Sequence, residues 1–396
     1  MKKENLSPAL SSEATSTTTS EDVNANWERV VRRRSFLKGL GIAGATLTAG
    51  SLLVPAGLAD TRPRKSGSSG KLGKGDVAIL KFLAAAELIE SDLWTQYAEL
   101  GGANGGNPAY ILALQNLDGD MPQYITDNTD DELSHAAFLN AYLQFRGEQP
   151  VSLDAFRTLP SSQATGARQI GRLTNLMNLN VDTSWYTRYR SGQNPDLGAH
   201  FKGPVTIVNE PAIPLNDIDT PPNQPQPVPP ETPQESRMQA IANTAGFHFA
   251  MIEQGGSSLY ATLAQQVQDA EVLRIVISIG GVEIDHFGLW HDKAGNAVAQ
   301  PLAGVTDPET GLTFPDLNNP AKELTQTNKI LPEPCSFLSK SFPKCSVIRP
   351  TSTTNSGATA AVTGLTSDLL FQGQSSQFFD LVTQLATDAD AAQRGF

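Results

Sequence analysis

The feature of this sequence that most constrains its fold is a four-residue motif that occurs twice, as Glu132-x-x-His135 and as Glu283-x-x-His286. An α-helix turns once in about 3.6 residues, so a Glu and a His three positions apart lie on the same helix face. A carboxylate and an imidazole in this arrangement can bind one metal ion. The chain has only 5 His in 396 residues, so two such pairs are hard to attribute to chance. The two pairs therefore predict two metal ions held by helices.

Each pair is preceded by a second repeated segment. Ile89-Glu90 is followed by Tyr97-Ala98 and Leu100, and Ile252-Glu253 is followed by Tyr260-Ala261 and Leu263. Both halves thus contain I-E, Y-A-x-L and E-[L/I]-x-H in this order, which we interpret as an internal duplication. An isolated E-x-x-H is more often an exposed helical pair than a pair of ligands. The duplication favours ligands.

Residues 1–59 have the pattern of an export signal. Arg32-Arg33-Arg34-Ser35-Phe36-Leu37-Lys38 closely matches the twin-arginine pattern, and a Gly- and Ala-rich, moderately apolar run follows to Leu58. Small residues at Gly57 and Ala59 suit cleavage before Asp60. We expect the twin-arginine export machinery to deliver the protein, already folded, to the periplasm or the cell exterior. An uncleaved membrane anchor is the alternative, but Pro55 and several Gly disfavour it.

The charge balance restricts the partners. The formal net charge is -12, and the removed segment carries seven basic and five acidic residues, so the mature chain has about -14. Such a surface repels nucleic acid and anionic membranes and favours cations. No later segment has the pattern of a membrane span, so none is expected after cleavage. The two cysteines, Cys335 and Cys345, predict one local disulfide in an oxidising compartment.

Four helices carry the repeated motifs, and the segments around them predict one domain over residues 76–296. Residues 60–75 are expected to be a linker, and 297–396 an irregular C-terminal extension with a last helix near 375–392. The helices are expected near 76–100, 129–146, 235–267 and 269–293. Residues 148–234 form a long crossover with helical pieces near 152–158 and 165–180 and a Pro-rich end. Two independent domains are disfavoured, because each would contain only half of a metal site.

Two local patterns leave alternatives open. Thr129 and Glu132 have capping-box spacing, so the Glu132 carboxylate could cap a helix instead of binding a metal. The run from Val272 to Ile279 is rich enough in β-branched residues for a strand. We predict a helix there because the apolar pattern continues into the second E-x-x-H pair.

This order of motifs resembles the ferritin-like superfamily over residues 76–147 and 235–294, and within it the exported proteins that include the plant desiccation-related group. The resemblance implies an all-α fold, an antiparallel four-helix bundle with one long crossover. It also implies two iron or manganese ions. Glu132 and Glu283 would bridge the two ions, Glu90 and Glu253 would each bind one, and His135 and His286 would each supply an imidazole.

Other residues near these positions have open roles. Glu87, one turn before Glu90, is an alternative ligand. Tyr97 and Tyr260 are either hydrogen-bond donors beside the site or ordinary core residues. Asp131 and Asp285 either orient the imidazoles or lie on solvated helix faces, and His248 is expected to be a partly buried His without a ligand role.

The resemblance implies oxidation of ferrous ion, or reduction or dismutation of peroxide. The alternative is a non-catalytic, stress-related scaffold with a structural or vestigial metal site. A hollow iron-storage shell is disfavoured, because the crossover and the C-terminal extension would obstruct its packing. A small homo-oligomer is compatible with these features.

Overall fold

The computed structural model describes residues 71–188, 203–217, 236–318, 339, 341–345 and 356–392. The predicted export signal, residues 60–70 of the predicted linker and the Pro-rich end of the crossover lie outside these residues. Cys335 also lies outside them, so its disulfide with Cys345 stays a prediction.

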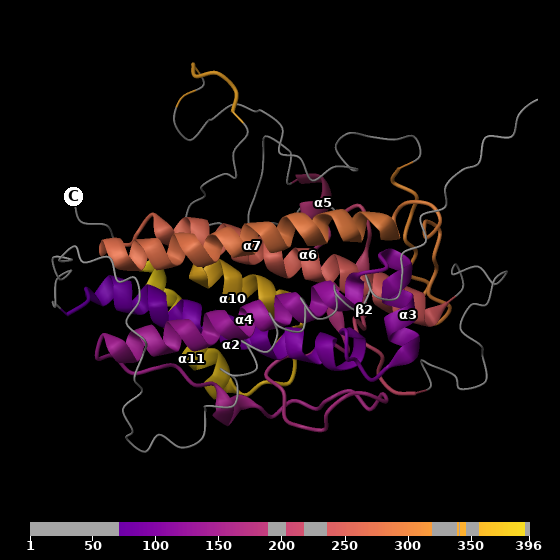
Figure 1. Cartoon of the computed structure of the whole chain (residues 1–396), viewed down its shortest axis with the longest axis horizontal. Coiled ribbons are helices and arrows are strands. Elements are labelled where there is room, and N and C mark those ends of the chain that lie inside the picture. Colours follow the sequence, from indigo (N-terminus) through magenta and orange to yellow (C-terminus); the bar gives the residue numbers. More distant parts are fainter. Residues whose placement is uncertain are drawn as a thin grey trace, which may run out of the picture. The chain divides into compact units, whose positions relative to one another are not determined.

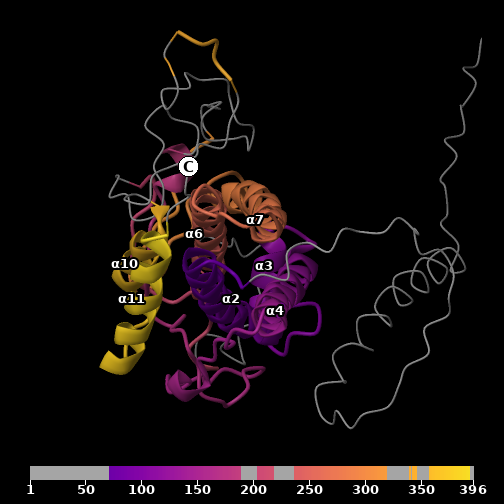
Figure 2. The ribbon, with the colours of Figure 1, turned by 90° about the vertical axis from the view of Figure 1, so that its left-hand side faces the viewer.

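Four long helices of the described residues form the bundle: α2 (Lys74–Gly101), α4 (Met121–Phe145), α6 (Arg237–Ala264) and α7 (Ala270–Ala297). Helix α2 packs along α4, and α6 packs along α7, as the end-on view in Figure 2 shows. A shorter helix, α3 (Pro108–Leu117), connects α2 to α4 and contacts α6 (Figure 1). The predicted all-α fold is confirmed.

Helix α4 begins at Met121, whereas the sequence pattern placed its start at Thr129. Pro122 is in the first turn, where the missing backbone N–H costs no helical hydrogen bond. Thr129 is inside the helix, and its hydroxyl donates to the carbonyl oxygens of Ile125 and Trp94. The capping-box interpretation was therefore wrong, and Glu132 is free of a capping role.

The second pair of helices begins close to the predicted positions. The Ser236 hydroxyl accepts a hydrogen bond from the Gln239 amide, and the Asp269 carboxylate accepts from the amides of Glu271 and Val272. The β-branched run from Val272 to Ile279 is helical, as predicted, because its apolar residues bury one face of α7 against the bundle.

Helix α6 is buried along almost its whole length. It is covered by α7, α3, the crossover strands and α10, so polar and apolar positions alike are removed from water. At Gly280 of α7, an added Cβ would lie 2.8 Å from the Cβ of Tyr260. Glycine therefore permits the close approach of α6 and α7. Within the described residues, no helix is both long and apolar enough to cross a membrane.

The described parts of the crossover, residues 148–188 and 203–217, have little regular structure. It contains a 3₁₀ turn (η1, Asp154–Phe156), a short helix (α5, Trp185–Arg188) and two strands, β1 (Leu179–Val181) and β2 (Ile207–Glu210). The strands pair antiparallel, with Leu179 opposite Glu210. The helix predicted over residues 165–180 was wrong, because hydrogen bonds to the bundle satisfy the backbone of this segment in place of a helical ladder.

Within the described residues, the C-terminal extension contributes two helices, α10 (Ala358–Ser367) and α11 (Ser376–Asp390). Helix α11 confirms the predicted last helix, whereas α10 lies in a stretch that was expected to be irregular. Helix α11 packs against α2, and α10 packs against α11 and α6. The two helices therefore cover one flank of the bundle (Figure 2).

Asp92 of α2 fixes the crossover to the bundle. Its buried carboxylate accepts hydrogen bonds from the backbone amides of Leu173 and Thr174 and from the Thr174 hydroxyl, and it pairs with Arg157 at 2.6 Å. These contacts satisfy backbone groups of an irregular segment that packs directly against α2.

We expect Asp92→Ala to lower the free energy of unfolding by about 3 kcal/mol, because two buried amides and a guanidinium lose their acceptor. Urea denaturation would measure this loss. Asp154→Ala is the matched control, because Asp154 is an exposed partner of the same Arg157. Equal stability of the two variants would contradict this role of Asp92.

Candidate metal centre

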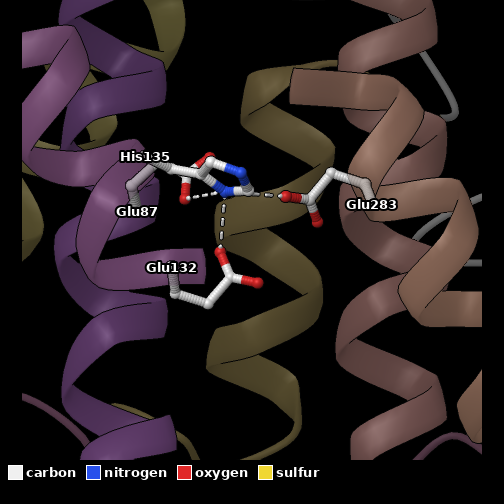
Figure 3. Close-up of side chains that lie close together, drawn as sticks. All are labelled: Glu87, Glu132, His135 and Glu283. Atoms are coloured by element: carbon white, nitrogen blue, oxygen red, sulfur yellow. Dashed lines mark hydrogen bonds and ion pairs between the residues drawn. The ribbon is translucent and has the colours of Figure 1, made fainter. Parts of the chain in front are cut away.

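A group of carboxylates from three helices surrounds His135 in the interior of the bundle (Figure 3). The Nδ1 atom of His135 lies 3.2 Å from Glu132 Oε2, 3.3 Å from Glu87 Oε2 and 3.5 Å from Glu283 Oε1. The three carboxylates are fully buried, and the imidazole is nearly so. Helices α2, α4 and α7 thus direct four potential metal ligands at one point.

A second group surrounds His286. Its Nδ1 atom lies 3.1 Å from Glu132 Oε1 and 3.3 Å from Glu253 Oε2. Glu283 completes this group, and within each group the ligand atoms lie within 4.8 Å of one another. Each group therefore has the size of a single-ion site.

Glu132 and Glu283 belong to both groups. One carboxylate oxygen of Glu132 faces His135 and the other faces His286. This is the arrangement that a carboxylate bridging two ions requires. The geometry agrees with the bridging roles expected for Glu132 and Glu283.

The structure places Glu87 in the first group, where the sequence pattern favoured Glu90. Residues three apart on a helix differ in direction by about 60°. Glu87 faces His135 on α4, whereas Glu90 turns toward α6 and α10 and lines an apolar cavity there. The repeated I-E and Y-A pattern suggested Glu90, but it could not reveal which of two adjacent helix positions faces α4.

Asn128 and Trp290 hold the carboxylates from one side. The Asn128 amide donates to Glu132 Oε1 at 2.9 Å and to Glu253 Oε1 at 3.0 Å, and its oxygen accepts from Trp290 Nε1 at 2.6 Å. Neither residue was predicted from the sequence. The signal for Asn128 was its position one turn before Glu132 on the same helix face.

Asp131 lies at the outer edge of the site. Its Oδ2 atom is 3.1 Å from His286 Nε2, so it orients the ring with Nδ1 toward the carboxylates. Asp131 thus combines the two roles considered for it, because its side chain is exposed to solvent and also contacts the imidazole of His286. Asp285 is exposed on α7.

The two repeated tyrosines have different surroundings. The Tyr260 hydroxyl donates to Glu87 Oε1, so Tyr260 touches the site. The Tyr97 hydroxyl instead contacts His248 Nδ1 at 2.7 Å. His248 is fully buried, and this burial lowers its pKa to about 3. Tyr97 and His248 thus form a separate pair away from the carboxylates.

Burial and mutual repulsion disturb the protonation of the carboxyl groups. Burial, together with nearby carboxylates, raises the pKa of Glu90, Glu253 and Glu283, and raises that of Glu87 to about 8. Burial also opposes ionisation of Glu132, but hydrogen bonds from His135 and His286 outweigh it and lower the pKa of Glu132 to about 2. Burial likewise opposes the charge on His135, yet the surrounding carboxylates raise its pKa to about 12.

Three buried carboxylate oxygens at this site make no hydrogen bond: Glu87 Oε2 and Glu283 Oε1, which have only ion-pair contacts with His135 Nδ1 at 3.3 and 3.5 Å, and Glu283 Oε2. Buried polar atoms without partners are rare and costly. A pair of divalent cations would satisfy these oxygens and neutralise the carboxylates. Oxygen-rich ligands with two imidazoles suit iron or manganese. The residues present therefore fit a dinuclear metal centre.

Comparison with known proteins gave one match. A family model described as "Ferritin-like domain" matches residues 75–296, more than half of the chain. No curated protein and no solved structure matches the chain. The matched residues contain all four helices of the candidate metal site and end before α10 and α11.

The ligand choice on α2 can be tested by substitution. We expect Glu87→Gln to weaken binding of Mn²⁺ or Co²⁺ by at least about tenfold, because it replaces a charged oxygen that faces His135. Glu90→Gln, the matched control one turn away, should change the affinity much less. Calorimetric titration of the metal-free protein would measure both, and the reverse ranking would favour the sequence-based assignment.

The pKa shifts predict how the stability of the metal-free protein depends on pH. Glu87 has a pKa near 4.5 in an unfolded chain and about 8 in the fold, so the native state holds an extra proton and loses stability as the pH rises through this interval. His135 acts in the same direction from pH 6.5 upward, because its pKa is raised from 6.5 to about 12. Glu132 has a lowered pKa, so its contribution is lost as the pH falls below about 4.5 toward 2.

We therefore expect the unfolding free energy of the metal-free protein to decrease as the pH rises from about 5 to about 8, as measured by urea denaturation. Metal should weaken or reverse this trend, because cations bind the deprotonated carboxylates more tightly. A stability that rises with pH without metal would contradict the protonation states described above.

Proposed function

This chain belongs to the ferritin-like domain family, and on that premise we propose that it binds a dinuclear iron or manganese centre between α2, α4, α6 and α7. The observation that carries the proposal is the sharing of Glu132 and Glu283 between two ligand groups, each with its own imidazole. A cluster of carboxylates without this sharing would point to one ion or to none.

The candidate ligands have distinct roles in this proposal. Glu87 and His135 would hold one ion, Glu253 and His286 would hold the other, and Glu132 and Glu283 would serve both. The Asn128 amide fixes the positions of Glu132 and Glu253, and the Tyr260 hydroxyl fixes that of Glu87. These contacts set the ligand geometry before a metal arrives, which reduces the cost of ordering the site.

Gly256 makes room for one of the bridging ligands. A Cβ at this position would overlap with Glu283 Oε2, so any other residue would displace that carboxylate. The paired glycines of α6 are unfavourable for a helix, where each costs about 1 kcal/mol relative to alanine. At Gly256 the space required by the Glu283 carboxylate explains why a glycine occurs in the helix despite this loss of stability.

A bound di-iron or di-manganese centre would supply one-electron redox chemistry toward ferrous ion, dioxygen or peroxide. The residues around the centre would hold protons and limit the access of water. Tyr260 and the histidines hold protons beside the carboxylates, and the buried helices limit access of water. We propose an oxidoreductase of the ferroxidase, peroxidase or catalase type, and export by the twin-arginine route remains part of the proposal.

The first test is the metal content of the exported chain. We expect about two iron or manganese ions per chain, lost in a Glu132→Ala/Glu283→Ala variant because both bridging ligands are gone. Elemental analysis after native export measures this. Asp130→Ala/Asp285→Ala is a matched control, since it removes two exposed carboxylates from the same helices.

A measurement of catalytic turnover distinguishes the oxidoreductase hypothesis from the hypothesis of a non-catalytic scaffold. The metal-loaded protein should oxidise ferrous ion or consume peroxide faster than the same concentration of free metal. A protein that holds two ions without turnover would be the non-catalytic scaffold. Low metal content in both the natural chain and the double variant would remove the metal proposal itself.

A further inference from the structure

The bundle has two seams at which its helix pairs meet, one between α2 and α6 and the other between α4 and α7. Within the described residues, the close backbone contacts lie inside the pairs, α2 with α4 and α6 with α7, and few lie across either seam. Helix α10 packs on α6 and α11 packs on α2, so these two helices cover the α2–α6 seam (Figure 2). Apart from α3, which reaches the end of α7 through Leu117 and Asn296, no helix of the described residues packs along the α4–α7 seam.

The buried ligand set comes closest to solvent at the α4–α7 seam. His135 of α4 and His286 of α7 are 7% and 6% exposed, whereas none of the four candidate carboxylate ligands is more than 1% exposed. The imidazoles are therefore the outer edge of the site. Because they belong to α4 and α7, this edge lies between the two helices that α10 and α11 leave uncovered.

The charges along the α4–α7 seam are paired at its ends and unpaired in its middle. Ion pairs close the two ends, Arg146 with Glu271 at 2.9 Å and Lys293 with Asp118 at 2.8 Å. Asp131 lies between them, and its carboxylate pairs with His286 and with no Lys or Arg of the described residues. Asp127, one turn before Asp131, and Asp285, next to His286, are exposed as well. The middle of the seam is therefore an exposed negative region beside a metal ligand.

His286 connects this exposed region to the buried carboxylates. Its Nδ1 atom faces inward, toward Glu132 and Glu253, and its Nε2 atom faces outward, 3.1 Å from Asp131 Oδ2. Two ligand atoms that lie at right angles around one ion, each about 2.1 Å from it, are about 3.0 Å apart. The Asp131 oxygen and the outer nitrogen of His286 thus have the spacing of two neighbouring ligands of one divalent cation.

We propose that divalent cations enter the metal centre through the α4–α7 seam and first bind there to Asp131 and His286. The exposed carboxylates attract cations to this point, and the buried oxygens of Glu283 that make no hydrogen bond favour their passage inward. The α2–α6 seam is the less favourable route, because it is covered and its cavity is lined by apolar residues except at Glu90. This inference rests on the proposed function, since it requires a centre that takes up metal.

Stopped-flow mixing of the metal-free, full-length chain with Co²⁺ tests the route. Asp131→Asn keeps the size of the side chain and removes its charge, so we expect cobalt uptake to be about tenfold slower at low salt and still to reach about two ions per chain. Glu90→Gln makes the matching change at the α2–α6 seam, and Asp380→Asn makes it on the exposed surface of α11. Both controls should take up cobalt at the rate of the natural chain.

Salt and the rate of cobalt release separate an entry role of Asp131 from the orientation of His286. Raising KCl from about 10 mM to about 0.5 M should slow uptake by the natural chain to nearly the rate of Asp131→Asn, because salt screens exposed charges. Asp131→Glu keeps the charge and should restore most of the uptake rate. If Asp131 only orients the ring, Asp131→Asn would release cobalt to a chelator faster and take it up at an unchanged rate, and this result would overturn the proposal.

The same experiment distinguishes a failure of this inference from a failure of the proposed function. No cobalt uptake by the natural chain would overturn both. Uptake of about two ions per chain, equally fast in Asp131→Asn and in the natural chain, would overturn the entry route and leave the metal centre standing. Slower uptake by Glu90→Gln than by Asp131→Asn would place the entry at the α2–α6 seam and would also overturn the inference.

Discussion

The burial of four carboxyl groups beside two imidazoles, inside a helical bundle, is the constraint on which the rest of the structure depends. Glu87, Glu132, Glu253 and Glu283 lie so close together that burial and mutual repulsion raise the pKa of all but Glu132. Burying these carboxylates destabilises the folded state unless cations or protons neutralise their charge. Its persistence in an otherwise well-packed bundle is the strongest physical argument for a metal-binding role.

The packing of the bundle keeps these carboxylates in position. Ser257 donates its hydroxyl to the backbone carbonyls of Glu253 and Glu283, and so ties α6 to α7 at the level of the ligands. Ser91 does the same between α2 and α4, through the Glu132 carbonyl. Each helix pair is thus joined beside its own ligands, and Asn128 of α4 connects the two pairs through Glu253.

The crossover and the C-terminal helices pack against the outside of the four-helix bundle. The crossover is held by Asp92 on one side and contacts the α10–α11 connection on the other. Through these contacts the C-terminal helices cover the flank formed by α2 and α6 and leave an apolar cavity beside Glu90 and Gly256. A bundle that stopped at the family match would expose this flank to solvent.

The sequence by itself determined the helical fold and five of the six residues in the two ligand groups, because the spacing of Glu and His three apart and its repetition depend only on helix geometry. Tertiary structure decided the remaining member of these groups, since Glu87 and Glu90 differ by about 60° around one helix and only the position of α4 selects between them. It also decided the start of α4, the partners of Asn128 and the enclosure of the cavity. These features depend on contacts between segments that are far apart in the chain, and a local sequence pattern does not predict such contacts.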